Sequence, residues 1–189
     1  MNTDNLIQNM ISAAKLDVNF FNAVEHDESK NGEALTVVII AAVASALGNG
    51  IGGIFSNGIV GGLMGALFGL LMVIVGYYLW SYLTHFIGVK FFNGEAEVGE
   101  VLRTFGYSYS PQVLTVLAFI PCVGWAIALI AGIWSLVAGI VAIREAMDFD
   151  TGKAVLTALI AWVIMIVLFL IVGTVFGVGA VGAGAIMGR

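Results

Sequence analysis

The sequence predicts an all-α membrane protein: a bundle of five transmembrane helices preceded by an amphipathic helix at the membrane surface. Hydrophobic residues make up 60% of the 189 positions and charged residues only 10%, whereas about a quarter of a soluble domain is charged. The charged residues also fall in clusters along the chain. Between the clusters lie three charge-free stretches, and each of them is longer than one membrane crossing.

The lengths of these stretches give the number of expected crossings. Residues 34–89, 104–143 and 154–188 are free of charge over about 56, 40 and 35 positions, and one crossing needs about 20 apolar residues. The three stretches are therefore long enough for two, two and one membrane-spanning helices, respectively. We expect a cytoplasmic segment at 1–33 and a membrane domain at 34–189, with spans near 35–55, 59–83, 107–122, 125–143 and 154–175.

The first 33 residues read as an amphipathic segment. Apolar side chains recur at spacings of three and four between Leu6 and Val24, which is typical of one helix or a broken pair. Asp17 is a candidate N-cap for the second of two short helices. The apolar face is expected either at the membrane surface or against the cytoplasmic loops of the protein. The segment lacks the basic and apolar regions of a signal peptide, so we expect it to stay in the cytoplasm.

Turn residues and charges place the connections between the spans. Ser56-Asn57-Gly58 predicts the outer turn of the first hairpin, and Pro121 with Gly124 predicts the outer turn of the second. Residues 90–103 and 144–153 are then cytoplasmic loops. Their charged side chains form the expected cytoplasmic surface, which includes Glu95, Glu97, Glu100, Arg103, Arg144 and Glu145.

The distribution of basic residues predicts the orientation of the chain in the membrane. With a cytoplasmic N-terminus, six of the seven Lys and Arg residues lie inside and only Arg189 lies outside, as the positive-inside rule expects. We therefore predict a multi-pass protein of the inner cell membrane.

The same residues argue against several function classes. No predicted span contains Asp, Glu, Lys or Arg, although transporters and pumps usually place such groups there. Nucleic acid is an unsuitable partner because the net charge is −5. No set of side chains predicts a catalytic site, a metal site or a cofactor. Hydroxyl groups inside the spans, such as those of Thr36, Thr115 and Ser135, are expected to bond their own helix backbone.

Glycines mark possible helix-packing faces. Gly61, Gly65 and Gly69 follow one another at four-residue spacing in the second span, and Gly124 and Gly132 belong to a similar series. Small residues let helices approach closely in lipid. We expect these faces to pack within the bundle, and the alternative is an interface with another protein.

Short motifs along most of the chain resemble those of the Yip domain family, the Ypt/Rab-interacting membrane proteins and their prokaryotic relatives. The most telling is the segment from Gly106 and Tyr107 to Pro111, which opens the third span. The other motifs are Leu16-Asp17, Phe20-Phe21, His85 with Gly88, Ala142-Ile143-Arg144-Glu145-Ala146 and Lys153-Ala154. The resemblance implies five spans and a cytoplasmic N-terminus.

Eukaryotic members of that family bind Rab-type GTPases and one another. This chain departs from their pattern, since it lacks the Asp-Leu-Tyr-Gly-Pro motif and has only about 33 residues before the first span. The departure argues against binding of a Rab-type GTPase and favours a prokaryotic-type member.

These observations favour a non-enzymatic scaffold or accessory protein whose partners are membrane lipids and other integral membrane proteins, including a second copy of itself. Two alternatives stay open at this point. One is an accessory subunit of a large respiratory or photosynthetic complex, and the other is a small transporter or channel.

Overall fold

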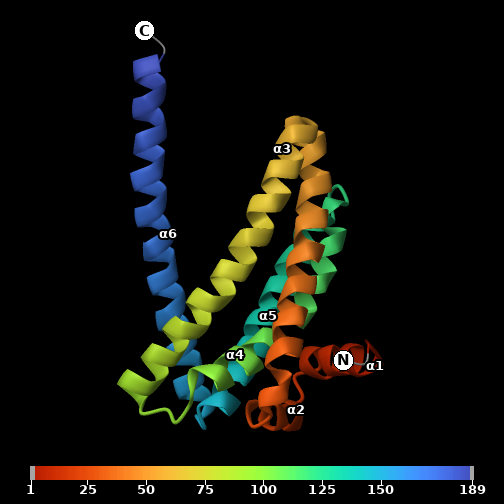
Figure 1. Ribbon diagram of the computed structural model, residues 1–189, viewed down its shortest axis with the longest axis vertical. Coiled ribbons are helices and arrows are strands. Elements are labelled where there is room, and N and C mark those ends of the chain that lie inside the picture. The colour runs from red at the N-terminus through yellow and green to blue at the C-terminus, as the bar shows by residue number, and fades with distance from the viewer. Residues whose placement is uncertain (1–2, 188–189) are drawn as a thin grey trace.

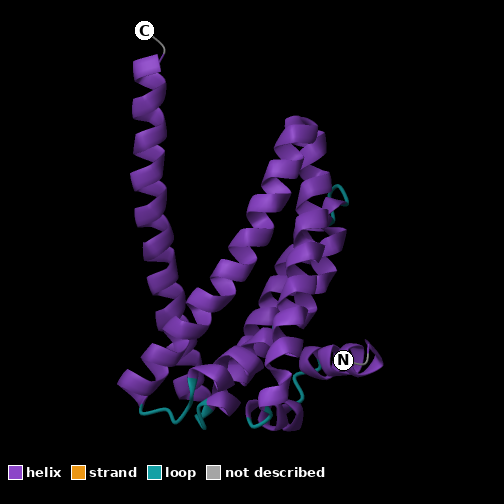
Figure 2. Cartoon of the chain, viewed as in Figure 1, coloured by secondary structure: helices purple, strands orange, loops and turns teal. Residues whose placement is uncertain are grey.

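The computed structural model describes the backbone of residues 3–187 and the side chains of residues 5–171 and of Thr174. Every secondary-structure element in this part of the chain is a helix, as Figure 2 shows. In chain order the elements are α1 (Thr3–Ala14), α2 (Val18–Glu25), η1 (Glu28–Lys30), α3 (Asn31–Phe92), α4 (Val98–Tyr107), η2 (Ser110–Phe119), α5 (Gly124–Ala146) and α6 (Thr151–Met187). The all-α prediction is confirmed.

Helix α3 is a hairpin of two limbs, residues 31–57 and 59–92, which meet at Gly58 (Figure 1). Gly58 has φ +76° and ψ 173°, a conformation that is open to glycine and costly for residues with a Cβ. The chain therefore reverses at the predicted Ser56-Asn57-Gly58 turn. The second limb continues nine residues beyond the expected end at 83 and stops at Phe92, where Asn93 adopts a left-handed conformation.

The connection after this hairpin differs from the prediction. Residues 90–103 were expected to form a loop, but α4 begins at Val98 and carries both Glu100 and Arg103. A capping box starts the helix, because the side chain of Glu97 accepts from the backbone of Glu100 and the side chain of Glu100 accepts from the Glu97 amide. The sequence predicted a loop here because the charged residues of this segment are typical of a solvated connection.

The expected third span is also shorter than predicted. Instead of one helix over 107–122, the structure has the 3₁₀ helix η2 over ten residues. At about 2 Å per residue it extends over about 20 Å, which is less than the roughly 30 Å of a hydrocarbon core. Three helical stretches are long and apolar enough to cross a membrane, namely Glu28–Phe92, Gly124–Ala146 and Thr151–Ile171. The first of these contains both limbs of the hairpin, and the count of five crossings stays a prediction.

The amino-terminal segment forms a broken pair of helices, one of the two arrangements predicted. The Asp17 carboxylate accepts hydrogen bonds from the amides of Asn19 at 3.0 Å and Phe20 at 3.4 Å, so it caps α2 as expected. Figure 1 shows α1 roughly perpendicular to the first limb of α3, beside its start, with α2 and α4 at that same end of the molecule.

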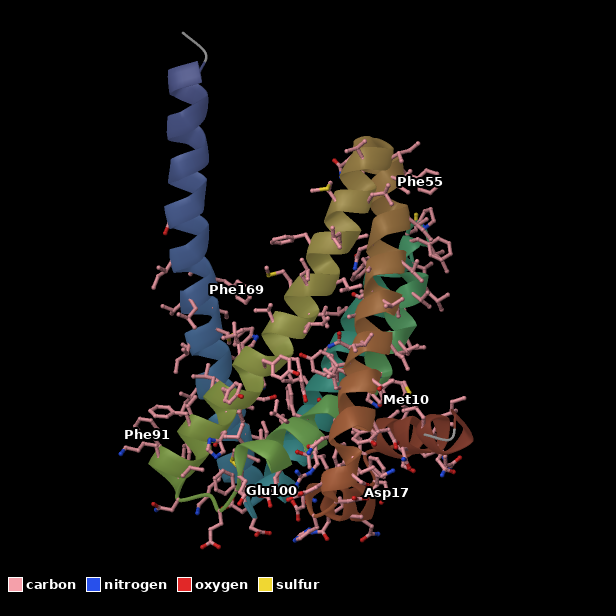
Figure 3. The ribbon with its side chains drawn as sticks, in the orientation of Figure 1. Met10, Asp17, Phe55, Phe91, Glu100 and Phe169 are labelled. Atoms are coloured by element: carbon pink, nitrogen blue, oxygen red, sulfur yellow. The ribbon has the colours of Figure 1, made fainter. Side chains whose placement is uncertain are left out.

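Most of the buried core lies toward this end of the molecule. Buried residues of α3 fall mainly before Gly50 and after Tyr77, whereas the hairpin tip is open, with Phe55 84% exposed. Figure 3 shows Phe55 at the tip, opposite Asp17, Glu100 and Phe91. The packed end therefore holds the short helices α1, α2 and α4, and the apolar tip is left to face its surroundings.

Candidate functional site

At the charged end of the molecule, residues of α2 and α3 surround Arg103 of α4, the one buried cation among the described residues. This side chain is only 6% exposed. Its Nε donates to the Val24 carbonyl at 3.3 Å, its Nη2 donates to the Glu25 carbonyl, and its Nη1 donates to Asn31 Oδ1 at 3.4 Å. The last carbonyls of a helix lack intrahelical partners and carry partial negative charge. Because α2 has no basic residue in its last turn, Arg103 supplies that charge from α4.

Polar contacts also fasten α1 to the rest of the chain. Asn9 Nδ2 donates to Glu33 Oε1 at 2.5 Å, and Lys30 Nζ donates to Glu33 Oε2 at 3.0 Å. At the other end of α1, Trp134 Nε1 on α5 donates to the Ala14 carbonyl at 2.7 Å. The first helix is thus held at two points, and packing against the protein accounts for part of its amphipathic pattern.

The Gly-Tyr motif lies at the centre of this assembly. A Cβ on Gly106 would come within 2.9 Å of the Ala34 Cβ and 3.0 Å of the Ala34 carbonyl oxygen, so only glycine lets α4 approach α3 this closely. The Tyr107 ring is fully buried and meets the Phe20 ring edge-on, with centroids 5.0 Å apart. Pro111 lies at the start of η2, where its missing amide hydrogen costs least. The three motif residues therefore shape the junction between α3, α4 and η2.

The other charged residues named from the sequence cap helices or pair with neighbours. Glu97 and Glu100 form the capping box of α4, and Arg144 Nη2 lies 2.7 Å from Glu145 Oε1. Glu95 is exposed in the preceding loop. Among the described residues, no group of three or more His, Cys, Asp or Glu side chains is placed to hold a metal ion. Arg103 differs from the rest because it is a buried structural link rather than part of an exposed surface.

Glu25 is a buried acid that the sequence did not single out. It is 5% exposed, and burial raises the pKa of its carboxyl to about 7. His26 lowers this pKa, and Asp148, Glu145 and Glu100 raise it further. The folded state therefore binds a proton more tightly than the unfolded state does.

This shift predicts that the docking of α2 depends on pH. Since the folded pKa of Glu25 exceeds its unfolded value of 4.5, the penalty of burying the charge is full above pH 7 and is relieved as the pH falls toward 4.5. We expect Glu25→Gln to slow backbone hydrogen exchange in α2 at pH 8 and to reduce its dependence on pH between 8 and 5. Glu28→Gln, at a position outside the buried core, is the matched control. Equal pH dependence in the wild type and Glu25→Gln would contradict the assignment.

Glycines of the predicted packing faces occupy three kinds of environment. A Cβ on Gly65, Gly69 or Gly132 would meet no described atom within 4 Å. A Cβ on Gly61 would approach Asn57 within its own hairpin, and one on Gly124 would collide with the Ala118 carbonyl in the turn before α5. Packing within the bundle is therefore not seen for Gly65 and Gly69 in the described part of the chain. Their role in binding another protein stays a prediction.

A cavity of ≈ 270 Å³ lies between α3, α4, η2, α5 and α6. Only the hydroxyl groups inside the spans hinted at this cavity in the sequence. Thr36 and Thr115 bond carbonyls of their own helices as expected, but the buried Ser135 hydroxyl, which lines the cavity, has no partner in the described residues. The expectation for Ser135 is therefore wrong, because an intrahelical bond is not made.

Comparison with known proteins gives one match. The family model described as Yip1 domain matches residues 17–172. Neither a curated protein nor a solved structure matches the chain.

Proposed function

Because the chain belongs to the Yip1 domain family, we propose that it is a non-enzymatic integral membrane scaffold or accessory protein that associates with other membrane proteins. It lies in the inner cell membrane with five crossings and a cytoplasmic N-terminus. Both ends of α3, the carboxyl end of α5 and the start of α6 lie at the end that also holds α1, α2 and α4 (Figure 1). These segments contain Lys90, Arg103, Arg144 and Lys153, and Lys30 directly precedes α3, which supports that orientation.

The observation that carries the proposal is the open glycine face of the second α3 limb. Gly65 is exposed and Gly69 is partly exposed, and a Cβ at either position would meet no described atom within 4 Å. Their large neighbours Met64 and Phe68 are each 63% exposed. Such a face offers a second helix close backbone approach between flanking apolar side chains, which is how helices associate in lipid.

The polar groups of the charged end support the same function in another way. Hydrogen bonds at this end join α1 and α2 to the rest of the protein, and they are made by Arg103, Glu33 and Trp134. The charged end thus joins helices from separate parts of the chain into one platform. A partner bound to the hairpin meets this platform in a fixed position.

The test uses two leucine substitutions on the open face. The Gly65→Leu/Gly69→Leu chain should fold normally, because a Cβ at either position meets no described atom within 4 Å, and should lose about tenfold in partner capture by cross-linking in native membranes. That loss corresponds to 1.4 kcal/mol. Gly52→Leu is the control, because Gly52 is also free of neighbours within 4 Å and lies on the other limb. Unchanged capture by the double variant would refute the role of this face.

A further inference from the structure

The exposed surface of α1 is divided between apolar and polar side chains. Leu6 and Ala13 are buried against the protein, whereas Ile7 is 53% exposed and Ile11 is 41% exposed. Ile7 and Ile11 are one helical turn apart and lie on one face. Gln8, about 100° around the helix from Ile7, is exposed as well. Because a surface helix in water exposes its polar face, packing against the protein leaves the exposed apolar face of α1 unexplained.

The exposed apolar face borders a groove of ≈ 530 Å³ between α1, α3, η2 and α5. The groove is walled on the other side by Ile40 of α3, by residues of η2 from Ser110 to Leu114, and by Trp134 of α5. Ile40 and Trp134 belong to stretches that are long and apolar enough to cross a membrane. Leu114 and Trp134 are 40% and 39% exposed. The groove is therefore continuous with the surface that the membrane-spanning helices present to their surroundings.

The lining of the groove has no unpaired polar side chain to offer a ligand. It contains no charged residue, and its polar side chains are those of Ser110 and Trp134. The Ser110 hydroxyl donates to the Tyr107 carbonyl at 2.7 Å, and the Trp134 indole donates to the Ala14 carbonyl at 2.7 Å. A water molecule needs about two to four polar partners, which these side chains do not supply. Hydrocarbon is the chemistry that fits the groove.

The position of α1 indicates the same surroundings. Figure 1 shows α1 roughly perpendicular to the first limb of α3 and nearer the hairpin tip than α2 is. When that limb crosses the bilayer, α1 lies along the membrane plane. The last carbonyls of a helix lack intrahelical partners, and the one at Ala14 accepts from Trp134. Backbone groups out of reach of water must be satisfied by the protein, so this bond suits a helix at the hydrocarbon boundary.

We propose that α1 lies in the membrane interface at the charged end, and that acyl chains of bilayer lipids fill the groove between α1 and η2. The polar face of α1, with Gln8, is then turned toward the headgroups and water. A membrane-spanning helix of a partner protein fits this groove less well. Helix α1 projects from the bundle beside the start of α3 (Figure 1), so it blocks a helix that runs along η2 to the charged end, whereas an acyl chain ends at its ester group.

Spin labels that collide with dissolved oxygen or with a water-soluble nickel chelate test this placement, because oxygen concentrates in hydrocarbon and the chelate stays in water. The full-length chain carries Cys122→Ser, which removes its free thiol, and one nitroxide at Ile11→Cys. It is reconstituted in phosphatidylcholine vesicles. We expect an oxygen-to-chelate accessibility ratio several-fold higher than at the matched position Gln8→Cys. The Ile11 label should lie about 5–10 Å into the headgroup and acyl boundary.

Two further labels extend the test to the neighbouring turn and to the opposite wall. Ile7→Cys should give the same high ratio, and it provides the test if Ile11→Cys fails to fold. Leu114→Cys, on the η2 wall, should also be readily accessible to oxygen, and a low accessibility there would exclude acyl chains from the groove. Ratios at Ile7 and Ile11 as low as the ratio at Gln8 would place α1 in water and overturn the proposal.

The same measurement separates lipid from protein as the occupant. Low accessibility of the Ile7 and Ile11 labels to both reagents would show that protein, such as a second copy of the chain, covers this face, and it would also overturn the proposal. The vesicles contain only this chain and lipid, so the result does not depend on the proposed scaffold role. Partner capture by the Gly65→Leu/Gly69→Leu chain tests that role separately.

Discussion

Replacing Arg103 with Met is expected to release α2 from the membrane domain. The substitution keeps much of the apolar stem but leaves the carbonyls of Val24 and Glu25 without their donors. Hydrogen bonds to a charged donor are worth about 1.5–3 kcal/mol each, and relief of the buried charge offsets part of the loss, so we expect α2 docking to weaken by about 2–4 kcal/mol. Backbone hydrogen exchange in residues 18–26 should accelerate by more than tenfold.

Arg144→Met is the matched control for this prediction. Arg144 lies at the same end, but its ion pair with Glu145 is partly exposed, with the arginine side chain 28% accessible. Such pairs contribute about 1 kcal/mol or less, so exchange in α2 should change little. Similar exchange in the Arg103→Met and Arg144→Met chains would show that Arg103 does not hold α2 in place.

The second large effect is expected from Gly106→Val. The added Cβ would lie 3.0 Å from the Ala34 carbonyl oxygen and 2.9 Å from the Ala34 Cβ. Backbone cannot yield as a flexible side chain does, so α4 must move away from α3. Overpacking of this kind costs about 1–3 kcal/mol, and here it also disturbs the buried Tyr107. We expect a lower midpoint of thermal unfolding, measured by the loss of monodisperse protein in detergent.

Two further chains check that the effect comes from this contact. Gly52→Val adds the same side chain at a helical glycine with open surroundings and should leave the midpoint nearly unchanged. Ala34→Gly removes the neighbouring Cβ, so it should recover part of the stability lost in Gly106→Val. A Gly106→Val chain as stable as the wild type would contradict the close approach of α4 to α3.

Local signals in the sequence explain which features could be predicted. The charge-free stretches predicted the apolar helices, Gly58 predicted the hairpin turn, and Asp17 predicted the cap of α2. Each of these features depends on residues within a few positions of one another. The Gly-Tyr motif was also found, although its reason, contact with Ala34, is visible only in the structure.

Long-range contacts explain what was missed. Arg103 and Val24 are 79 positions apart, and Trp134 and Ala14 are 120 apart, so no local pattern connects them. The charged residues of α4 are typical of a solvated connection and so predict a loop, whereas tertiary contacts bury Arg103. The cavity beside α6 combines residues from five elements, and none of them stands out in the sequence by itself.

The most direct test of the scaffold proposal is purification of the native chain from its own membranes in a gentle detergent, followed by quantitative mass spectrometry. The account predicts at least one other integral membrane protein at fixed stoichiometry, or a defined oligomer of the chain itself, and loss of that association in the Gly65→Leu/Gly69→Leu chain. A monodisperse solitary chain, with no partner captured by cross-linking before extraction, would contradict it.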